Sequence, residues 1–304
     1  MTTAQVESIE LEGHEVRITK PDRVLWPALG LTKRWMLGYY AAVADALLRH
    51  GRGHPVTLHR FPEGIDETHW YQTRAPAHPD WVHTVTFRPE RTGKVFDVVV
   101  LDGVATLLWA AQIGSIEIHP FLGAADALDH PTVLVFDLDP GPERSPADVA
   151  EAALQVREVL DDLGLEAWVK ASGQKGLHVL VPLAGTQPYG VTKPFARAVA
   201  ALLVKEHAAT LTDNMNRTAR TGKVFIDWSQ NDPGKSTVAP YSLRGLTTPT
   251  VAAPLTWDEV AAIAGGARPR AFHLTPDDVL DRLERDGDIL EAMADAAHTV
   301  PAPS

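Results

Sequence analysis

Cysteine is absent from all 304 residues of this sequence. Disulfide bridges and cysteine-ligated zinc are therefore excluded, so any metal ion has to be held by oxygen or imidazole ligands. No stretch reaches the roughly 20 consecutive apolar residues that cross a bilayer. The first residues also lack the basic and apolar regions of a secretory signal. We therefore expect a cytoplasmic protein with no membrane partner.

Positive charge is scarce overall, because the net charge is −11, which argues against a general nucleic-acid coat. The basic residues gather near the N-terminus, where residues 15–60 hold eight Lys or Arg against three acids. This distribution predicts a basic face that could meet a polyanion. An ordinary mixed surface is the alternative interpretation of the same charges.

The hydrophobic content of 45% is ample for a large core. From residue 133 onward the expected order is strand, helix, strand, strand, helix, strand, as in a ferredoxin-like antiparallel sheet backed by helices. Ser145 and Pro146 predict the start of the first of these helices. We expect one domain over residues 1–304, with an N-terminal α+β subdomain at 1–125 and a second subdomain at 126–295.

Further elements are expected in the N-terminal part. Residues 6–18 alternate like a strand, and Thr32 caps a helix that continues to about Leu48. Near the other end, residues 275–294 predict a helix. We expect the N-terminal layer to pack on the sheet that begins at residue 133.

Two carboxylates stand at the end of an apolar strand that begins at Val133. Asp137 and Asp139 are two residues apart, so they face the same side of the strand, and Pro140-Gly141 ends it. Two neighbouring anions are stable there only if cations or water reach them. Oxygen ligands at this spacing suit Mg²⁺ or Mn²⁺. A solvated strand end is the alternative.

The glycine-bearing segment at residues 172–178 predicts an anion-binding turn. Its two glycines let backbone N–H groups turn toward a ligand, and Ser172 and Lys175 add donors for phosphate oxygens. The segment is not a Walker A loop, because the glycine spacing differs and a strand follows. A plain hairpin turn with an exposed lysine is the alternative.

A third carboxylate, Asp227, again ends an apolar strand. Arg220 and Gln230 flank it, and Arg244 follows further along the chain. With the two earlier acids, Asp227 predicts a three-carboxylate metal site. Cationic donors beside such a site are what a triphosphate–metal complex needs.

Taken together, these segments resemble the archaeo-eukaryotic primase superfamily, and more narrowly the polymerase domain of bacterial ligase D, which serves non-homologous end joining. The resemblance runs from about Asp22 to Asp288. It is carried by residues 23–27, 135–141, 172–178, 225–231 and 239–245. It implies a primase-polymerase fold of the α+β class, in which an antiparallel RRM/ferredoxin-like catalytic sheet packs against the N-terminal α+β layer.

The resemblance also assigns roles to residues. It implies that Asp137, Asp139 and Asp227 are catalytic and hold two divalent cations, Mn²⁺ or Mg²⁺. It implies nucleotide binding by His119, Ser172, Lys175, His178, Arg220, Gln230 and Arg244. It also implies that His119 lies near the sugar of the nucleotide. It implies DNA binding by Arg23, Lys33, Trp70 and Tyr71, the basic pair at a 5′-phosphate and the aromatic pair against the template. Trp-Tyr stands here where two phenylalanines are common, and Arg23 stands where lysine is common.

The implied activity is template-dependent nucleotidyl transfer, a DNA-directed polymerase or primase that adds NTPs or dNTPs to a primer 3′-hydroxyl. The implied task is gap filling in double-strand-break end joining or excision repair. The implied partners are DNA with a gap or end that bears a 5′-phosphate, and also a separate ligase and an end-binding repair protein. Such a protein would work in the cytoplasm, at the nucleoid.

Two other functions are compatible with part of this pattern. A haloacid-dehalogenase-like phosphatase also ends an apolar strand in Asp-x-Asp and would use Asp137 as nucleophile. Pro140-Gly141 departs from that signature, and the tight pair of later carboxylates that it requires is replaced by Asp227 alone. A non-catalytic DNA-end-binding module would use only the basic N-terminal face, which leaves the three acids unexplained.

Overall fold

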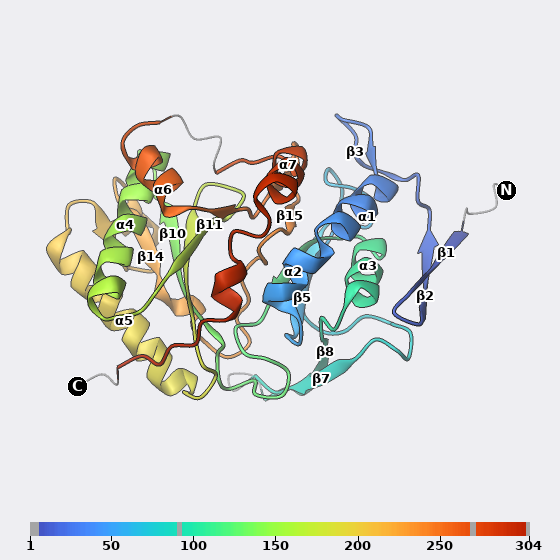
Figure 1. The fold of residues 1–304 in the computed structure, drawn as a ribbon, viewed down its shortest axis with the longest axis horizontal. Coiled ribbons are helices and arrows are strands. Elements are labelled where there is room, and N and C mark those ends of the chain that lie inside the picture. The colour runs from blue at the N-terminus through green and yellow to red at the C-terminus, as the bar shows by residue number, and fades with distance from the viewer. Residues whose placement is uncertain (1–5, 90–92, 268–271, 302–304) are drawn as a thin grey trace. The chain divides into compact units, whose positions relative to one another are not determined.

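The computed structural model describes residues 6–89, 93–267 and 272–301 (Figure 1). The chain divides into two compact units. Unit 1 comprises Met1–Phe121, Ser236–Val251 and Thr275–Arg285, and unit 2 comprises Leu122–Lys235, Ala252–Leu274 and Asp286–Ser304. Segments that are far apart in sequence therefore build each core. Among the described residues, no helix is both long enough and apolar enough to cross a membrane.

Unit 2 is built on a six-stranded sheet with the order β13-β14-β10-β12-β11-β17. Neighbouring strands are antiparallel, except that β13 and β14 are parallel. The strands are β10 (Val133–Pro140), β11 (Trp168–Ala171), β12 (Leu177–Pro182), β13 (Leu211–Thr212), β14 (Val224–Asp227) and β17 (Pro254–Leu255). The central order β14-β10-β12-β11 is that of a ferredoxin-like sheet, as predicted.

The helices of unit 2 follow local sequence signals. They are α4 (Pro146–Asp162), α5 (Tyr189–Glu206) and α6 (Trp257–Ala264), with short 3₁₀ turns at Arg217–Arg220, Trp228–Gln230 and Glu291–Ala294. Ser145 caps α4 as predicted, because its hydroxyl accepts from the Asp148 amide and the Asp148 carboxylate accepts from the Ser145 amide. Gly164 follows the helix with a φ of +71°. Buried residues of α4 contact β10 and β12.

Unit 1 contains a three-stranded antiparallel sheet of order β6-β5-β9 together with several two-stranded pairs. The strands of the sheet are β5 (Val56–Arg60), β6 (Trp70–Gln72) and β9 (Ser115–Pro120). The pairs are β1 (Val6–Leu11) with β2 (His14–Thr19), β3 (Val24–Trp26) with β4 (Leu31–Thr32), β7 (Thr84–Phe87) with β8 (Phe96–Val99), and β15 (Leu243–Arg244) with β16 (Thr250–Val251). Its helices include α1 (Lys33–Ala42), α2 (Ala44–Gly51), α3 (Val104–Gln112) and α7 (Pro276–Asp286).

Two predicted helices differ from those observed. Thr32 caps α1 as predicted, but the helix expected to reach Leu48 is divided at Val43, whose φ of −97° and ψ of 4° break the regular geometry between α1 and α2. The helix expected over residues 275–294 ends at Asp286, because Gly287 adopts a φ of +70° that ends a helix.

Candidate functional site

The three predicted acids lie on neighbouring strands of the unit 2 sheet. β10 carries Asp137 and Asp139, and the register places Asp137 directly opposite Asp227 on β14. Directly opposite residues share a face and have Cβ atoms about 5 Å apart. Asp139 shares that face because it lies two residues along β10. The sheet therefore gathers all three carboxylates on one face, and both acids of β10 are half-buried in an otherwise mostly buried strand.

Hydrogen bonds and an ion pair orient two of these carboxylates. Asp137 Oδ1 lies 3.3 Å from Nε2 of His178, which is directly opposite on β12. Asp227 Oδ1 accepts from the Ser229 amide (2.9 Å) and hydroxyl (2.6 Å), and its Oδ2 accepts from the Gln230 amide (2.9 Å). The arrangement is a set of hard oxygen ligands that suits Mg²⁺ or Mn²⁺.

Two glycines let other segments approach the strand that carries the acids. A Cβ on Gly176 would lie 2.5 Å from the Leu138 carbonyl oxygen and 3.1 Å from Oδ1 of Asp139. A Cβ on Gly141 would collide with the backbone carbonyl of Arg220. A side chain at either position would therefore displace the backbone around the acids.

The predicted anion-binding turn connects β11 to β12, beside the acids. Ser172 Oγ accepts hydrogen bonds from the Gln174 amide (3.3 Å) and the Gly176 amide (3.2 Å). Lys175 is exposed on the turn, whereas Ser172 and His178 are buried. His178 directly follows this turn on β12 and contacts Asp137. The turn therefore lies close to the acids.

Arg220 lies over the same face of the sheet. Its guanidinium is 3.5 Å from the centre of the Phe225 ring, and Phe225 is directly opposite Asp139. Arg220 Nη2 donates to the Met215 carbonyl (3.2 Å). Its Nε is buried and, within the described part of the chain, has no hydrogen-bond partner. A buried donor of this kind is suited to a ligand.

Sequence reasoning missed Lys170, a buried lysine in the same row. Lys170 on β11 is directly opposite His178, which is directly opposite Asp137. The register therefore aligns one lysine, one histidine and two carboxylates across four strands. Lys170 is only 1% exposed, and lysine is rarely buried so fully unless it is paired. A lysine within a short strand resembles an ordinary surface residue, so the sequence offered no signal for it.

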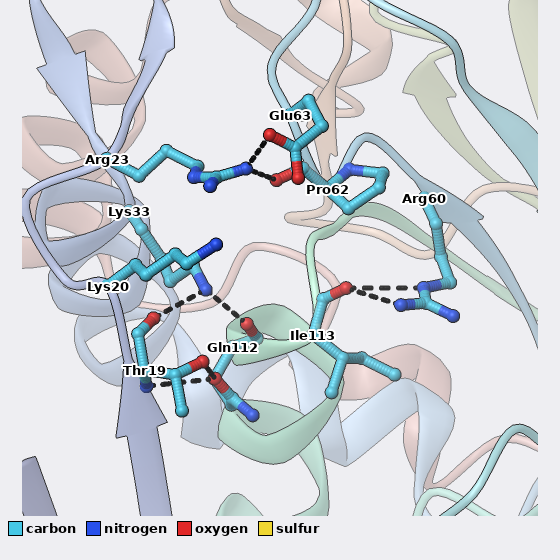
Figure 2. Close-up of a pocket in the computed structure, with 9 residues that line it drawn as sticks. All are labelled: Thr19, Lys20, Arg23, Lys33, Arg60, Pro62, Glu63, Gln112 and Ile113. Atoms are coloured by element: carbon cyan, nitrogen blue, oxygen red, sulfur yellow. Dashed lines mark hydrogen bonds and ion pairs between the residues drawn. The ribbon is translucent and has the colours of Figure 1, made fainter. Parts of the chain in front are cut away.

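Unit 1 contains a basic pocket of about 240 Å³ (Figure 2). It unites the predicted residues Arg23 and Lys33 with Lys20 and Arg60, two cations of the predicted basic face to which sequence reasoning gave no individual role. Glu63 is the one acid in the lining, and it pairs with Arg23. The lining residues are Thr19, Lys20, Arg23, Lys33, Arg60, Pro62, Glu63, Gln112 and Ile113.

Lys33 is held at the base of this pocket by backbone carbonyls. Its Nζ donates to the carbonyl oxygens of Thr19 (2.8 Å) and Gln112 (2.7 Å). Burial, together with the positive charges of Arg23 and Lys20, lowers the pKa of Lys33 to about 8. Lys33 is therefore not part of a solvated basic face, because it is only 6% exposed.

The predicted aromatic pair lies on β6 of the three-stranded sheet. Trp70 is 41% exposed and Tyr71 is 59% exposed, so core packing does not explain them. The Tyr71 ring stacks on His59, with centroids 3.9 Å apart and planes at 17°. The Arg60 guanidinium lies 5.4 Å from the Trp70 ring centre. These contacts order the two rings, which remain partly exposed.

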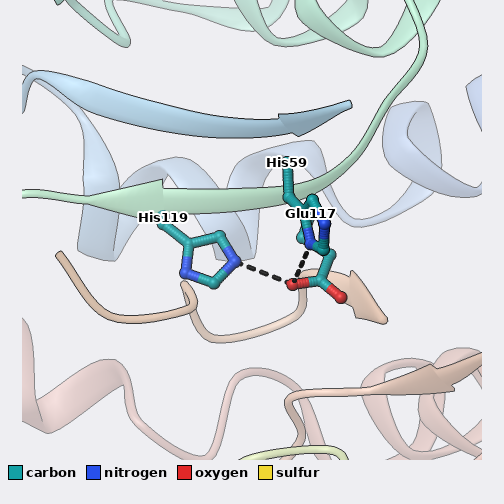
Figure 3. A group of neighbouring side chains, drawn as sticks. All are labelled: His59, Glu117 and His119. Carbon is teal, nitrogen blue, oxygen red and sulfur yellow. Dashed lines mark hydrogen bonds and ion pairs between the residues drawn. The ribbon is translucent and has the colours of Figure 1, made fainter. Parts of the chain in front are cut away.

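His119 belongs to a buried cluster with Glu117 and His59 (Figure 3). His119 Nε2 lies 2.8 Å from Glu117 Oε2, and His59 Nδ1 lies 3.2 Å from the same oxygen. The other carboxylate oxygen, Oε1, accepts from the Gly245 amide (3.0 Å) and lies 3.4 Å from Nε of Arg244. Glu117 and its contact with Arg244 were missed by sequence reasoning.

Electrostatics fix the charge states in this cluster. Burial raises the pKa of Glu117, but hydrogen bonds from His119 and His59 and the charge of Arg244 outweigh burial and hold that pKa well below its usual range. Burial lowers the pKa of His119 and outweighs the opposing effect of Glu117. At neutral pH the cluster therefore contains an ionised carboxylate and a neutral His119.

The ligand atoms of these three side chains all lie within 4.8 Å of one another, a spacing that also suits a transition metal. The guanidinium of Arg244 argues against this, because a bound cation would lie across one carboxylate from another positive charge. Neighbouring groups also already surround both oxygens of Glu117. A hydrogen-bonded network accounts for the cluster without a metal ion.

Known proteins of one family are similar to this chain. A family model for the LigD primase-polymerase domain matches residues 32–290. The multifunctional non-homologous end joining protein LigD of Mycolicibacterium smegmatis is 41% identical over 286 residues, which cover 92% of this chain and 36% of the relative. The bifunctional LigD of Bacillus subtilis is 29% identical over 276 residues, which cover 90% and 43%. The chain spans about a third of the length of the curated relatives first matched.

A solved structure is also similar to this chain. The polymerase domain of Mycobacterium tuberculosis ligase D in complex with DNA superimposes with a TM-score of 0.84 and 39% sequence identity. The match covers 92% of this chain and 98% of that one. These matches confirm the predicted resemblance, the α+β primase-polymerase fold and the nucleotidyltransferase class. They favour neither the phosphatase nor the non-catalytic end-binding module.

Proposed function

Because this chain belongs to the family of LigD primase-polymerase domains, we propose that it extends a primer 3′-hydroxyl on a DNA template with NTPs or dNTPs. The observation that carries this proposal is the sheet register, which places Asp137 opposite Asp227 with Asp139 on the same face. Polymerases of this type depend on metal ions, and three half-buried carboxylates are a suitable ligand set.

Asp137, Asp139 and Asp227 would hold two divalent cations, Mn²⁺ or Mg²⁺. When bound, such cations lower the pKa of the primer hydroxyl and neutralise charge on the leaving pyrophosphate. Ser229 and Gln230 orient Asp227 through hydrogen bonds, and this preorganisation reduces the rearrangement needed at the site.

Other residues of unit 2 would bind the triphosphate. Lys175 is exposed on a glycine turn and is free to reach phosphate oxygens. Arg220 offers a buried Nε on the face that carries the acids. Ser172 retains its hydroxyl proton while its oxygen orders the turn. His178 contacts Asp137 and so joins the phosphate site to the metal ligands.

Residues of unit 1 would bind the nucleotide and the DNA. His119 and Arg244 are the proposed nucleotide-binding residues, and Trp70 and Tyr71 offer the exposed rings that stack on unpaired template bases. The pocket of Arg23 and Lys33 would bind a 5′-phosphate, because it gathers cations and charge-assisted donors around one small cavity.

This chemistry suits short-gap filling during end joining or excision repair, at the nucleoid. A separate ligase would then seal the product, and an end-binding repair protein would present the DNA. The M. tuberculosis domain was solved with DNA, which supports a DNA substrate here.

The proposal is tested with a gapped template that bears a 5′-phosphate, supplied with Mn²⁺ or Mg²⁺ and with NTPs or dNTPs. We expect extension by the wild type and none by Asp137→Ala or Asp227→Ala. Glu151→Gln, on an exposed face of α4, is the control. Thermal melting must show that the variants remain folded. Normal extension by a folded Asp227→Ala protein would contradict the proposal.

A further inference from the structure

Glu117 is the most enclosed carboxylate among the described residues, with a side chain only 1% exposed. The sheet brings it into contact with its neighbours. β9 places Glu117 and His119 two residues apart on one face, and β5 places His59 directly opposite Glu117. Arg244 reaches the same carboxylate from β15. Figure 3 shows the two imidazole rings directed at one carboxylate oxygen.

The two oxygens of Glu117 have different partners. Oε2 accepts from His119 Nε2 and lies 3.2 Å from His59 Nδ1, whereas Oε1 accepts from the Gly245 amide and lies beside the Arg244 guanidinium. Because the carboxylate is ionised, it can only accept hydrogen bonds. His119 must therefore donate through Nε2–H, and a neutral imidazole with its proton on Nε2 has an unprotonated Nδ1.

We propose that Glu117 is a positioning residue that fixes His119 as the neutral Nε2–H tautomer, so that His119 presents Nδ1 as a hydrogen-bond acceptor. The group it would accept from is a hydroxyl of the nucleotide sugar, an assignment that rests on the proposed function. Glu117 itself touches no substrate in this scheme. It acts through His119 and, by its second oxygen, holds Arg244 and the backbone at Gly245.

The substitution Glu117→Gln gives a sharp expectation. An amide has one accepting oxygen and one donating nitrogen. If its oxygen continues to accept from Gly245 and to face the Arg244 guanidinium, its nitrogen faces His119 Nε2, which must then become an acceptor. The opposite orientation would place the amide nitrogen against the donors of both Gly245 and Arg244. His119 should therefore change to the Nδ1–H tautomer, which turns its free nitrogen from an acceptor into a donor.

Nitrogen-15 NMR of histidine-labelled protein measures the tautomer of His119 directly. The two tautomers move the chemical shifts of the two ring nitrogens in opposite directions. The His119 signals are assigned by their loss in His119→Gln. We expect Nε2–H in the wild type at neutral pH and in Glu117→Asp, which keeps two accepting oxygens. We expect Nδ1–H in Glu117→Gln. Glu166→Gln, an identical change at an exposed position of unit 2, should leave the His119 signals unchanged.

Single-nucleotide incorporation measures whether the acceptor is used. Fluorine on the sugar can accept a hydrogen bond weakly but cannot donate one, so an acceptor at His119 should favour a hydroxyl over fluorine at the 2′ or the 3′ position. One neutral hydrogen bond corresponds to roughly twofold to tenfold in kcat/KM. We expect Glu117→Gln to reduce that preference by about this factor, and Glu166→Gln to leave it unchanged.

Three results would overturn the proposal. The first is a wild-type His119 that carries its proton on Nδ1 or is a cation at neutral pH, which needs no variant to observe. The second is a folded Glu117→Gln protein whose His119 stays Nε2–H. The third is a switched tautomer with no change in preference at either sugar position. If the wild type incorporated no nucleotide at all, the proposed function would fail, while the NMR result would still decide the role of Glu117.

Discussion

Raising the pH from 7 to 9 should selectively lower the affinity of this protein for a 5′-phosphate. Lys33 lies at the base of the basic pocket, and its pKa is lowered to about 8 by burial and by the charges of Arg23 and Lys20. Its ammonium form predominates below pH 8 and is lost as the pH rises above it. The phosphate is a dianion over this whole range, because its second pKa is about 6.

The size of the effect follows from the titration of one group. If only the protonated form of Lys33 binds the phosphate well, the apparent Kd rises about tenfold between pH 7 and pH 9, as expected for one proton released above a pKa near 8. A bound phosphate raises the pKa of Lys33, which pulls a proton onto it during binding. The affinity and the number of protons taken up should therefore change together.

The assay compares DNA with a 5′-phosphate against DNA with a 5′-hydroxyl at each pH. Only the ratio of the two affinities reports on the pocket, since general DNA binding cancels. Lys33→Met should lose the phosphate preference and its pH dependence, whereas Lys205→Met, on the basic last turn of α5, serves as the matched control. A phosphate preference that stays constant from pH 7 to pH 9 in the wild type would refute this role of Lys33.

Further perturbations test other parts of the molecule. Tyr71→Ala should weaken binding to a primer with an unpaired template by about tenfold, since one stacked base is worth roughly 1–3 kcal/mol, while binding to blunt duplex should stay unchanged in the same titration. Gly176→Ala should lower the free energy of unfolding by about 1–3 kcal/mol and reduce extension, because its Cβ would approach the Leu138 carbonyl oxygen to 2.5 Å. An unchanged stability and extension rate would show that the turn can move to accommodate the side chain. Ser145→Ala should cost about 1 kcal/mol in thermal or urea unfolding and leave extension unchanged.

Much of unit 2 could be predicted because its signals are local. The capping box at Ser145 and the apolar run of β10 each act within a few residues. The ferredoxin-like order followed from counting strands and helices. The break at Val43, which divides the helix expected from Thr32 to Leu48, could not be predicted, because neither a proline nor a glycine stands at that position.

The metal-ligand pattern was also accessible, since Asp137 and Asp139 share a face by the two-residue period of a strand. Their position opposite Asp227 depends on the register between β10 and β14, which the sequence does not state. Lys170 was missed for the same reason. It becomes informative only when β11 and β12 align it with His178.

Glu117 shows why some site residues cannot be identified from the sequence alone. In the alternating run from Ile116 to His119, the glutamate resembles a solvent-facing residue of a half-buried strand. It is buried because β5 brings His59 opposite it and a segment far along the chain brings Arg244. An ionised carboxylate in such a place is stable only because each oxygen has donors beside it. Its partners, and therefore the tautomer it imposes on His119, are properties of the tertiary fold and not of the strand that carries it.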